Sequence, residues 1–221
     1  FFENLIDIKK NNKTTIHELG YVKLDYLRRR RKTIFKRKQI IIAPTHIYSI
    51  KEFSMKDSLE TIIENFLNKT SYKIVLRPHP ANRKDRLFIN IFNKFKKFEN
   101  FKYDISDDYY DNYMSSMILL TDISGTAYTY SFLTNNPVIF YIRNKKIIKE
   151  YKFNKLRYFK DIRLIGKKIF NKNDIINTVN ELLKNKLKYK VKIKKLKHRR
   201  IKYLDQTENR FLEIINKLEN K

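Results

Sequence analysis

The chain has 221 residues, of which 42% are apolar, and its formal net charge is +27. This length can bury one sizeable core, and the lack of cysteine excludes disulfides and thiolate metal sites. No apolar run approaches the roughly 18 residues of a membrane-spanning helix, and the first residues lack the basic-then-apolar order of a signal peptide. We therefore expect a cytoplasmic protein and, since the sequence starts without methionine, a fragment.

The first half of the chain alternates strand-like and helix-like segments. Residues 39–43 are a β-branched run that ends at Pro44, which predicts a buried strand. Residues 72–76 predict a second strand, which must end at the sequence RPHP of residues 77–80 because proline cannot donate to a strand ladder. Between the strands, Asp57 and Glu60 match a capping box. A helix is predicted there from the apolar positions Leu59, Ile62, Ile63, Phe66 and Leu67.

The second half continues the alternation. A helix with Phe88, Ile91, Phe92 and Phe95 on one face precedes a third strand at 101–105. Short helices at 107–116 and 127–133 precede strands at 117–120 and 137–141, and a sixth strand is expected at 162–165. Two final helices are predicted from apolar positions, the first from Ile175, Ile176, Val179, Leu182 and Leu183 and the second from Phe211, Ile215 and Leu218.

This alternation predicts an α/β fold with a Rossmann-like, doubly wound parallel sheet. If the strand order is 3-2-1-4-5, a crevice opens between the carboxyl ends of the first and fourth strands. We expect the loops there to bring together three groups of residues, namely Thr45 with His46, Arg77 with His79, and residues 122–126. The predicted domains are a nucleotide-binding domain at 1–182 and a basic helical tail at 183–221.

The segment LLTDISGTAYTY, residues 119–130, joins the fourth strand to a helix that begins near Thr126. A helix start presents unpaired N–H groups and a positive dipole end, which suit an anion. Gly125 permits close backbone approach, and the hydroxyls of Ser124 and Thr126 can either donate to a phosphate or cap the helix. Asp122 could orient a ribose, a loop amide or its own loop.

The sequence RPHP adds two further candidates. Arg77 offers a bidentate guanidinium to phosphate, and His79 is held between two prolines. His46 is a weaker candidate for ligand contact, since a lone histidine in a loop is more often structural or solvated. A metal site is not predicted, because the acidic cluster at residues 104–111 lacks the glycine of a calcium loop and reads as a helix N-terminus. No Walker loop, dinucleotide fingerprint, zinc-ligand spacing or nucleophile elbow is present.

Four segments resemble, in order and approximate spacing, the CDP-glycerol glycerophosphotransferase family, the polymerases and primases of teichoic-acid-like polymers. They are GYVKLDYL at 20–27, IIIAPTH at 40–46, IVLRPHP at 74–80 and ILLTDISGTAYTYSFLTNNPVIFY at 118–141. Each motif alone is weak, whereas four in register are fairly specific. The resemblance implies a GT-B-like enzyme of which this chain is the C-terminal, nucleotide-binding half.

By this resemblance, His79 is the candidate catalytic residue and contacts the donor pyrophosphate together with Arg77. The resemblance also implies that Ser124, Gly125 and Thr126 hold phosphate and that Asp122 shapes their loop. Three features depart from the family pattern. A Trp-His-Gly-Thr segment, whose histidine is a candidate general base, has no counterpart here; Gly125 replaces a second serine; and Asp25 follows Gly20 without the usual arginine and proline.

The implied reaction is attack of an acceptor hydroxyl on the β-phosphorus of a CDP-activated donor, with release of CMP. No cofactor is implied, and a divalent metal requirement stays open. The expected partners are CDP-glycerol, a polymer or lipid-linked acceptor, and an anionic membrane surface on which the protein lies peripherally, at the inner face of the cell membrane. The runner-up function is that of a nucleotide-sugar glycosyltransferase for capsule or lipopolysaccharide.

Two segments concentrate the positive charge, residues 28–38 and residues 183–203, and the second contains no acidic side chain. Such charge attracts nucleic acid, anionic membranes or phosphorylated substrates without choosing among them. A nucleic-acid-binding protein is the alternative of another class, although it leaves the RPHP and Gly125 segments unexplained. We expect no specific nucleic acid partner, and a solvated basic face without any partner is an equally good interpretation of the charge.

Overall fold

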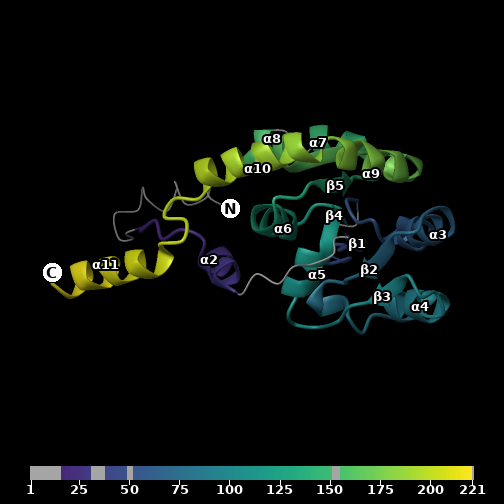
Figure 1. The fold of residues 1–221 in the computed structure, drawn as a ribbon, viewed down its shortest axis with the longest axis horizontal. Coiled ribbons are helices and arrows are strands. Elements are labelled where there is room, and N and C mark those ends of the chain that lie inside the picture. Colours follow the sequence, from purple (N-terminus) through teal and green to yellow (C-terminus); the bar gives the residue numbers. More distant parts are fainter. Residues whose placement is uncertain (1–15, 31–37, 49–51, 151–154, 221) are drawn as a thin grey trace. The chain divides into compact units, whose positions relative to one another are not determined.

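A computed structural model describes residues 16–30, 38–48, 52–150 and 155–220. Its centre is a six-stranded parallel sheet with the order β3-β2-β1-β4-β5-β6 (Figure 1). The strands are β1 (Gln39–Ile42), β2 (Lys73–Leu76), β3 (Phe101–Tyr103), β4 (Ser116–Thr121), β5 (Val138–Tyr141) and β6 (Gly166–Ile169). The predicted α/β class, parallel pairing and strand order are therefore confirmed. The order reverses between β1 and β4, where Ile42 pairs with Leu120 near the carboxyl ends of both strands.

Helices cover both faces of the sheet, as crossover connections require. Those that carry the crossovers and flank the sheet are α3 (Leu59–Lys69), α4 (Arg86–Phe95), α5 (Tyr110–Ser115), α6 (Thr126–Thr134), α7 (Lys145–Glu150), α8 (Arg157–Ile165) and α9 (Ile175–Lys184). One core cluster joins α3, α4 and α9 to alternate residues of the strands, such as Ile40, Ile42 and Leu120. In Figure 1, α5 and α6 lie on the other side of the sheet from α3 and α4. The central strands are buried on both faces, which explains why they are almost entirely apolar.

The predicted sixth strand at 162–165 is wrong. These residues end α8, in which Phe159, Ile162 and Ile165 recur at helical spacing and are buried. The strand β6 begins only at Gly166, whose backbone lies so close to Val138 of β5 that an added Cβ would be 1.8 Å from the Val138 carbonyl oxygen. Glycine therefore permits the pairing of β6 with β5 at this point.

Two local predictions also differ from the structure. The capping box at α3 is not formed, because the Asp57 carboxylate pairs with Arg143 and that of Glu60 pairs with Lys94. Gly20 has a φ of 104° and lies just before α2 (Val22–Arg29). In α11 (Thr207–Glu219) Ile214 is buried, whereas the predicted apolar face is largely exposed.

The described residues form two compact units, one within residues 38–197 that contains the sheet, and one made of residues 16–30 together with 198–220. Most of α10 (Lys186–Arg200) belongs to the unit that contains the sheet. Ile193 and Leu196 are buried, and Lys197 donates a hydrogen bond to the carbonyl oxygen of Phe132 in α6 at 2.8 Å. In the second unit, Asp25 of α2 accepts two hydrogen bonds from Thr207 at the start of α11.

Candidate phosphate site at the switch point of the sheet

The loops that follow β1, β2 and β4 meet at the carboxyl edge of the sheet, as the sequence predicts. The rings of His46, after β1, and His79, after β2, lie with centroids 5.4 Å apart in an edge-to-face arrangement. Thr45, next to His46, donates its backbone N–H to Asp122 after β4 at 2.9 Å. An unbroken series of contacts therefore links the three loops at the place where the strand order reverses.

Asp122 holds the loop of residues 122–125, which we call the β4–α6 loop, against the loop after β1. Its side chain is fully buried, and its second carboxylate oxygen accepts the N–H of Met55 at 3.2 Å. Burial raises the pKa of this carboxyl to about 6, although the hydrogen bonds from Thr45 and Met55 oppose that rise. Of the roles that the sequence left open, the observed one is the orientation of loop amides.

His79 begins a single 3₁₀ turn, η2 (Pro80–Asn82), and is exposed at the edge of the sheet. Its Nδ1 accepts the backbone N–H of Ala81 at 3.3 Å. Partial burial and the neighbouring His46 and Arg83 lower the pKa of the imidazole below its usual value, so the ring is neutral at pH 7. A neutral ring whose Nδ1 accepts carries its proton on Nε2, which leaves Nε2–H as a donor for a ligand oxygen.

Gly125 directly precedes α6 and is exposed. Its φ of −61° and ψ of −24° are open to any residue, and an added Cβ would meet nothing within 4 Å. The chain's own structure therefore does not require glycine here. The Ser124 hydroxyl accepts the N–H of Thr126 at 3.3 Å, and the Gly125 N–H has no partner among the described residues. This exposed helix start can receive an anion.

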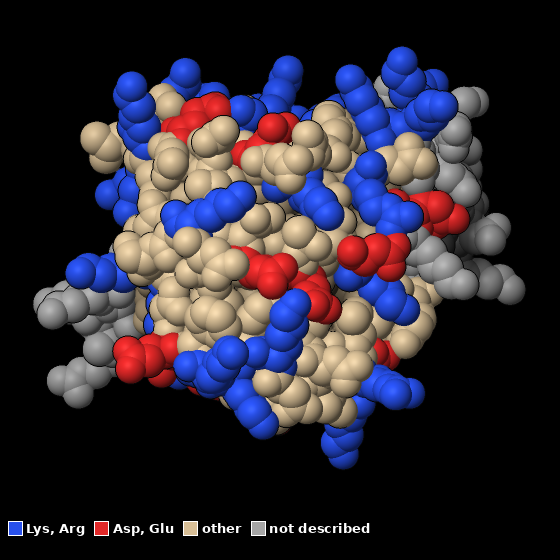
Figure 2. All heavy atoms as spheres, turned by 90° about the vertical axis from the view of Figure 1, so that its right-hand side faces the viewer, with Lys and Arg blue, Asp and Glu red and all other residues tan. Residues whose placement is uncertain are grey.

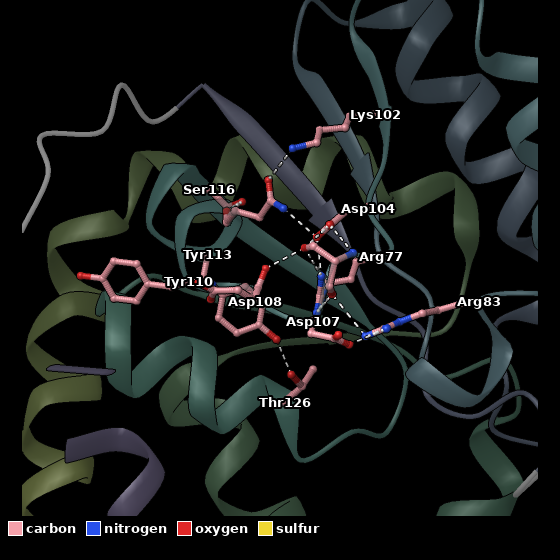
Figure 3. Close-up of polar contacts among 12 residues, drawn as sticks. Arg77, Arg83, Lys102, Asp104, Asp107, Asp108, Tyr110, Tyr113, Ser116 and Thr126 are labelled. Atoms are coloured by element: carbon pink, nitrogen blue, oxygen red, sulfur yellow. Dashed lines mark hydrogen bonds and ion pairs between the residues drawn. The ribbon is translucent and has the colours of Figure 1, made fainter. Parts of the chain in front are cut away.

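Arg77 lies in a polar network with the residues that follow β3 (Figure 3). Its guanidinium donates to the carboxylate of Asp104 at 2.5 Å and to the carbonyl oxygen of Ser106 at 2.8 Å. Asp104 also accepts the side-chain amide of Asn112 at 2.6 Å. The side chains of Arg77 and Asp104 are only 10% and 4% exposed. These contacts give Arg77 a role in joining the loops after β2 and β3.

Two tyrosines that the sequence did not single out hold the β4–α6 loop and the start of α6. The phenol of Tyr158, in α8, hydrogen-bonds the Ser124 peptide. The phenol of Tyr113, in α5, hydrogen-bonds the Thr126 hydroxyl, as Figure 3 shows. No local sequence pattern marks either tyrosine as a contact of this loop. The chain contains 15 tyrosines, and Tyr158 is 34 residues from its partner.

The predicted acidic helix start is observed, with Asp111 in the first turn of α5 and Asp108 accepting the N–H of Tyr110 at 2.9 Å. Within the described ranges, His, Asp and Glu side chains form no group of three that could hold a metal ion. Two surface hollows, of about 360 and 710 Å³, adjoin α9 and contain none of the predicted site residues. No helix in the described part of the chain is both long and apolar enough to cross a membrane.

The model of the CDP-glycerol:poly(glycerophosphate) glycerophosphotransferase family matches residues 9–217. No curated protein is significantly similar in sequence. Among solved structures, the wall teichoic acid polymerase TagF is 24% identical, with a TM-score of 0.54, and the match covers 88% of this chain and 46% of that one. A TagF variant soaked with CDPG gives a TM-score of 0.60 at 21% identity, over 91% of this chain and 52% of TagF.

The UDP-GlcNAc 2-epimerase of Methanocaldococcus jannaschii has the same fold, with a TM-score of 0.53 at 14% identity over 95% of this chain and 56% of the epimerase. At these identities the likeness establishes the fold alone, a GT-B-like α/β arrangement. The chain spans about half the length of the solved structures that it matches.

Proposed function

The chain belongs to the CDP-glycerol:poly(glycerophosphate) glycerophosphotransferase family, and on this premise we propose that it is the donor-binding half of a transferase. The enzyme moves glycerol phosphate, or a similar polyol phosphate, from a CDP-activated donor to an acceptor hydroxyl in the synthesis of a teichoic-acid-like or capsular polymer. One observation carries the proposal. The exposed start of α6 at Gly125 is linked to His79 through Asp122, Thr45 and His46 at the switch point of the sheet.

The donor diphosphate binds at this edge. The Gly125 N–H, the Ser124 hydroxyl and the dipole of α6 receive phosphate oxygens, and the Nε2–H of His79 donates to them from the other side of the switch point. Thr126 begins the helix, and Asp122 keeps the β4–α6 loop in place through the Thr45 and Met55 amides. Arg77 supports the site through Asp104, which replaces the direct phosphate contact implied by the resemblance.

In the reaction, the acceptor oxygen forms a bond to the β-phosphorus while the bond from that phosphorus to the bridging oxygen breaks. The departing group is CMP, and the hydroxyl proton goes to a base supplied from outside the described residues. His79 stabilises the negative charge that develops on the phosphate oxygens, which makes it the catalytic residue of this half. Donors fixed before the reaction starts are effective because they need no reorganisation.

The helix α10 supports a second part of the proposal, a peripheral position on an anionic membrane at the inner face of the cell membrane. Leu187 is 77% and Val191 53% exposed, and exposed lysines flank them, namely Lys188, Lys190, Lys194 and Lys195. Apolar and basic side chains on one exposed helix suit an anionic interface, at about 1 kcal/mol per basic residue near the surface. By contrast, Figure 2 shows basic side chains spread over the viewed face with acidic ones among them, which does not define a binding groove there.

Calorimetric titration of the chain with CDP-glycerol, CDP-ribitol and a UDP-sugar tests the donor. We expect saturable binding of a CDP-polyol and much weaker binding of the UDP-sugar. The second candidate, a nucleotide-sugar transferase, is favoured by the fold shared with a UDP-GlcNAc epimerase. Tight binding of the UDP-sugar without binding of cytidine nucleotides would establish that candidate and overturn the first.

A further inference from the structure

Tyr158 lies in the first turn of α8 and contacts the β4–α6 loop at Ser124. Its phenol oxygen accepts the backbone N–H of Ser124 at 3.0 Å and donates to the carbonyl oxygen of the same residue at 3.0 Å. One hydroxyl therefore bonds both backbone polar groups of Ser124. This two-point contact restricts rotation of the residue that precedes Gly125.

We propose that Tyr158 is a positioning residue for donor binding, which fixes Ser124 so that the Ser124 hydroxyl and the Gly125 N–H are aimed at the donor diphosphate. The inference rests on the proposed function and deepens it. Because Tyr158 takes the Ser124 N–H, that group is withdrawn from the ligand. The Ser124 hydroxyl accepts from Thr126, so its own hydrogen stays available as a donor.

Tyr158 is itself held by its surroundings. The phenol of Tyr128, in α6, donates to the Tyr158 carbonyl oxygen at 2.6 Å. The Tyr158 ring packs against those of Tyr128 and Phe140, with centroid distances of 5.2 and 6.3 Å. Burial keeps the pKa of the phenol far above neutrality, so its hydroxyl is present as a donor over the whole physiological range. Such a phenol can act as a support, because its hydroxyl both donates to and accepts from Ser124.

The groups proposed to face the phosphate lie on a loop that three side chains hold at separate points. Asp122 ties one end of the loop to the residues after β1, Tyr158 ties its middle to α8, and Tyr113 ties Thr126 to α5. Gly125 is the exposed residue among them. A loop held in this way presents its donors in one arrangement before the ligand arrives, which lowers the ordering cost of binding.

The substitution Tyr158→Phe tests the proposal, since it keeps the ring and removes both hydrogen bonds. We expect CDP-glycerol to bind about 10-fold more weakly by calorimetry, as loss of one to two net hydrogen bonds implies. The Ser124 amide should exchange its hydrogen at least about 10-fold faster, while the amides of β4 keep their protection. Tyr130→Phe is the matched control, because the Tyr130 phenol also donates to a backbone carbonyl, that of Ser116, at the opposite end of β4. It should leave both CDP-glycerol affinity and Ser124 exchange unchanged.

The outcomes separate this inference from the proposed function. If the unsubstituted chain binds no CDP-glycerol, the proposed function fails, while faster Ser124 exchange in Tyr158→Phe would still establish the contact. If the unsubstituted chain binds and Tyr158→Phe binds equally well, the positioning role is overturned. Equal losses of affinity in Tyr158→Phe and Tyr130→Phe, with equal falls in melting temperature, would assign Tyr158 a merely structural role and also overturn it.

Discussion

The carboxylate of Asp122 accepts the backbone N–H of Thr45 at 2.9 Å, and thereby joins the ends of β4 and β1, 77 positions apart in the sequence. Each of these strands is followed by a loop without repetitive structure, and such loops need side-chain partners for their amides. A buried carboxylate that accepts two amides supplies them. The arrangement of the loops at the switch point therefore depends on Asp122, which holds them through their backbone amides.

Substitution Asp122→Asn should destabilise the chain, because the asparagine Nδ2 would face one of the two amides and leave it unpaired, at about 1–3 kcal/mol. The effect should also depend on pH. The pKa in the folded chain is raised from 3.8 to about 6, so the folded state binds the proton more tightly than the unfolded state. This contribution is fully present below about pH 4 and is lost as the pH rises through 6, a change of about 3 kcal/mol.

Urea unfolding of the native chain and of Asp122→Asn at pH 4 and pH 7 measures this pH dependence of stability. The free energy of unfolding of the native chain should exceed that of Asp122→Asn by a larger margin at pH 4 than at pH 7. A margin that is equal at the two pH values would show that the carboxyl has the same pKa in the folded and unfolded states.

Gly125 gives a test of ligand approach that does not disturb the fold. Because an added Cβ would meet nothing within 4 Å, Gly125→Val should keep the melting temperature of the native chain. In the proposed site the branched side chain would occupy the space of a phosphate, so glycerol phosphate transfer by the proposed transferase should fall roughly 100-fold, as loss of charge stabilisation can cause. Gly125→Ser is the control, since its hydroxyl can donate to phosphate, and it should retain transfer. If Gly125→Val retains transfer as fully as Gly125→Ser does, this helix start is only a cap.

The pair of Arg77 and Asp104 should be a stability element rather than a ligand site. Each single substitution, Arg77→Gln or Asp104→Asn, leaves a buried partner and should lower the free energy of unfolding by about 3 kcal/mol. The double variant should lose less than the sum, because the two side chains contact each other. If Arg77→Gln unfolds like the native chain but no longer binds CDP-glycerol, Arg77 contacts the donor directly.

The pH dependence of donor affinity tests His79. A diphosphate diester keeps its charge between pH 5 and 8, whereas the imidazole, whose pKa is lowered by partial burial and by His46 and Arg83, gains a proton only below its usual range. CDP-glycerol should therefore bind more tightly as the pH falls from 7.5 to 5.5. His79→Gln keeps a neutral N–H donor and should flatten the dependence. An equally steep dependence in His79→Gln would assign the titration to another group.

The central sheet could be predicted because its strands carry local signals. Residues 39–42 and 73–76 are β-branched or apolar runs that end close to proline, and their alternation with amphipathic helices implies parallel pairing. The edge strand β6 contains Lys167 and Lys168 and lacks such a signal. The apolar spacing just before it belongs to α8, which explains the misplaced sixth strand.

The candidate site was predictable as a set of loops but not as a set of contacts. The strand order alone places His46, His79 and the β4–α6 loop at one edge. The direction of a side chain depends on long-range partners, so the sequence did not reveal that Arg77 turns to Asp104 or that Tyr158 holds Ser124. Motif spacing carries no information about such pairs.

The most direct test of the donor site is a nuclear magnetic resonance titration of the chain with CDP-glycerol, with the backbone amides and histidine rings assigned. The proposed site predicts that the Gly125 amide and the His79 ring show the largest shifts and that both saturate at the same ligand concentration. Shifts concentrated at the hollow beside β6 and α9, with Gly125 and His79 unchanged, would contradict it.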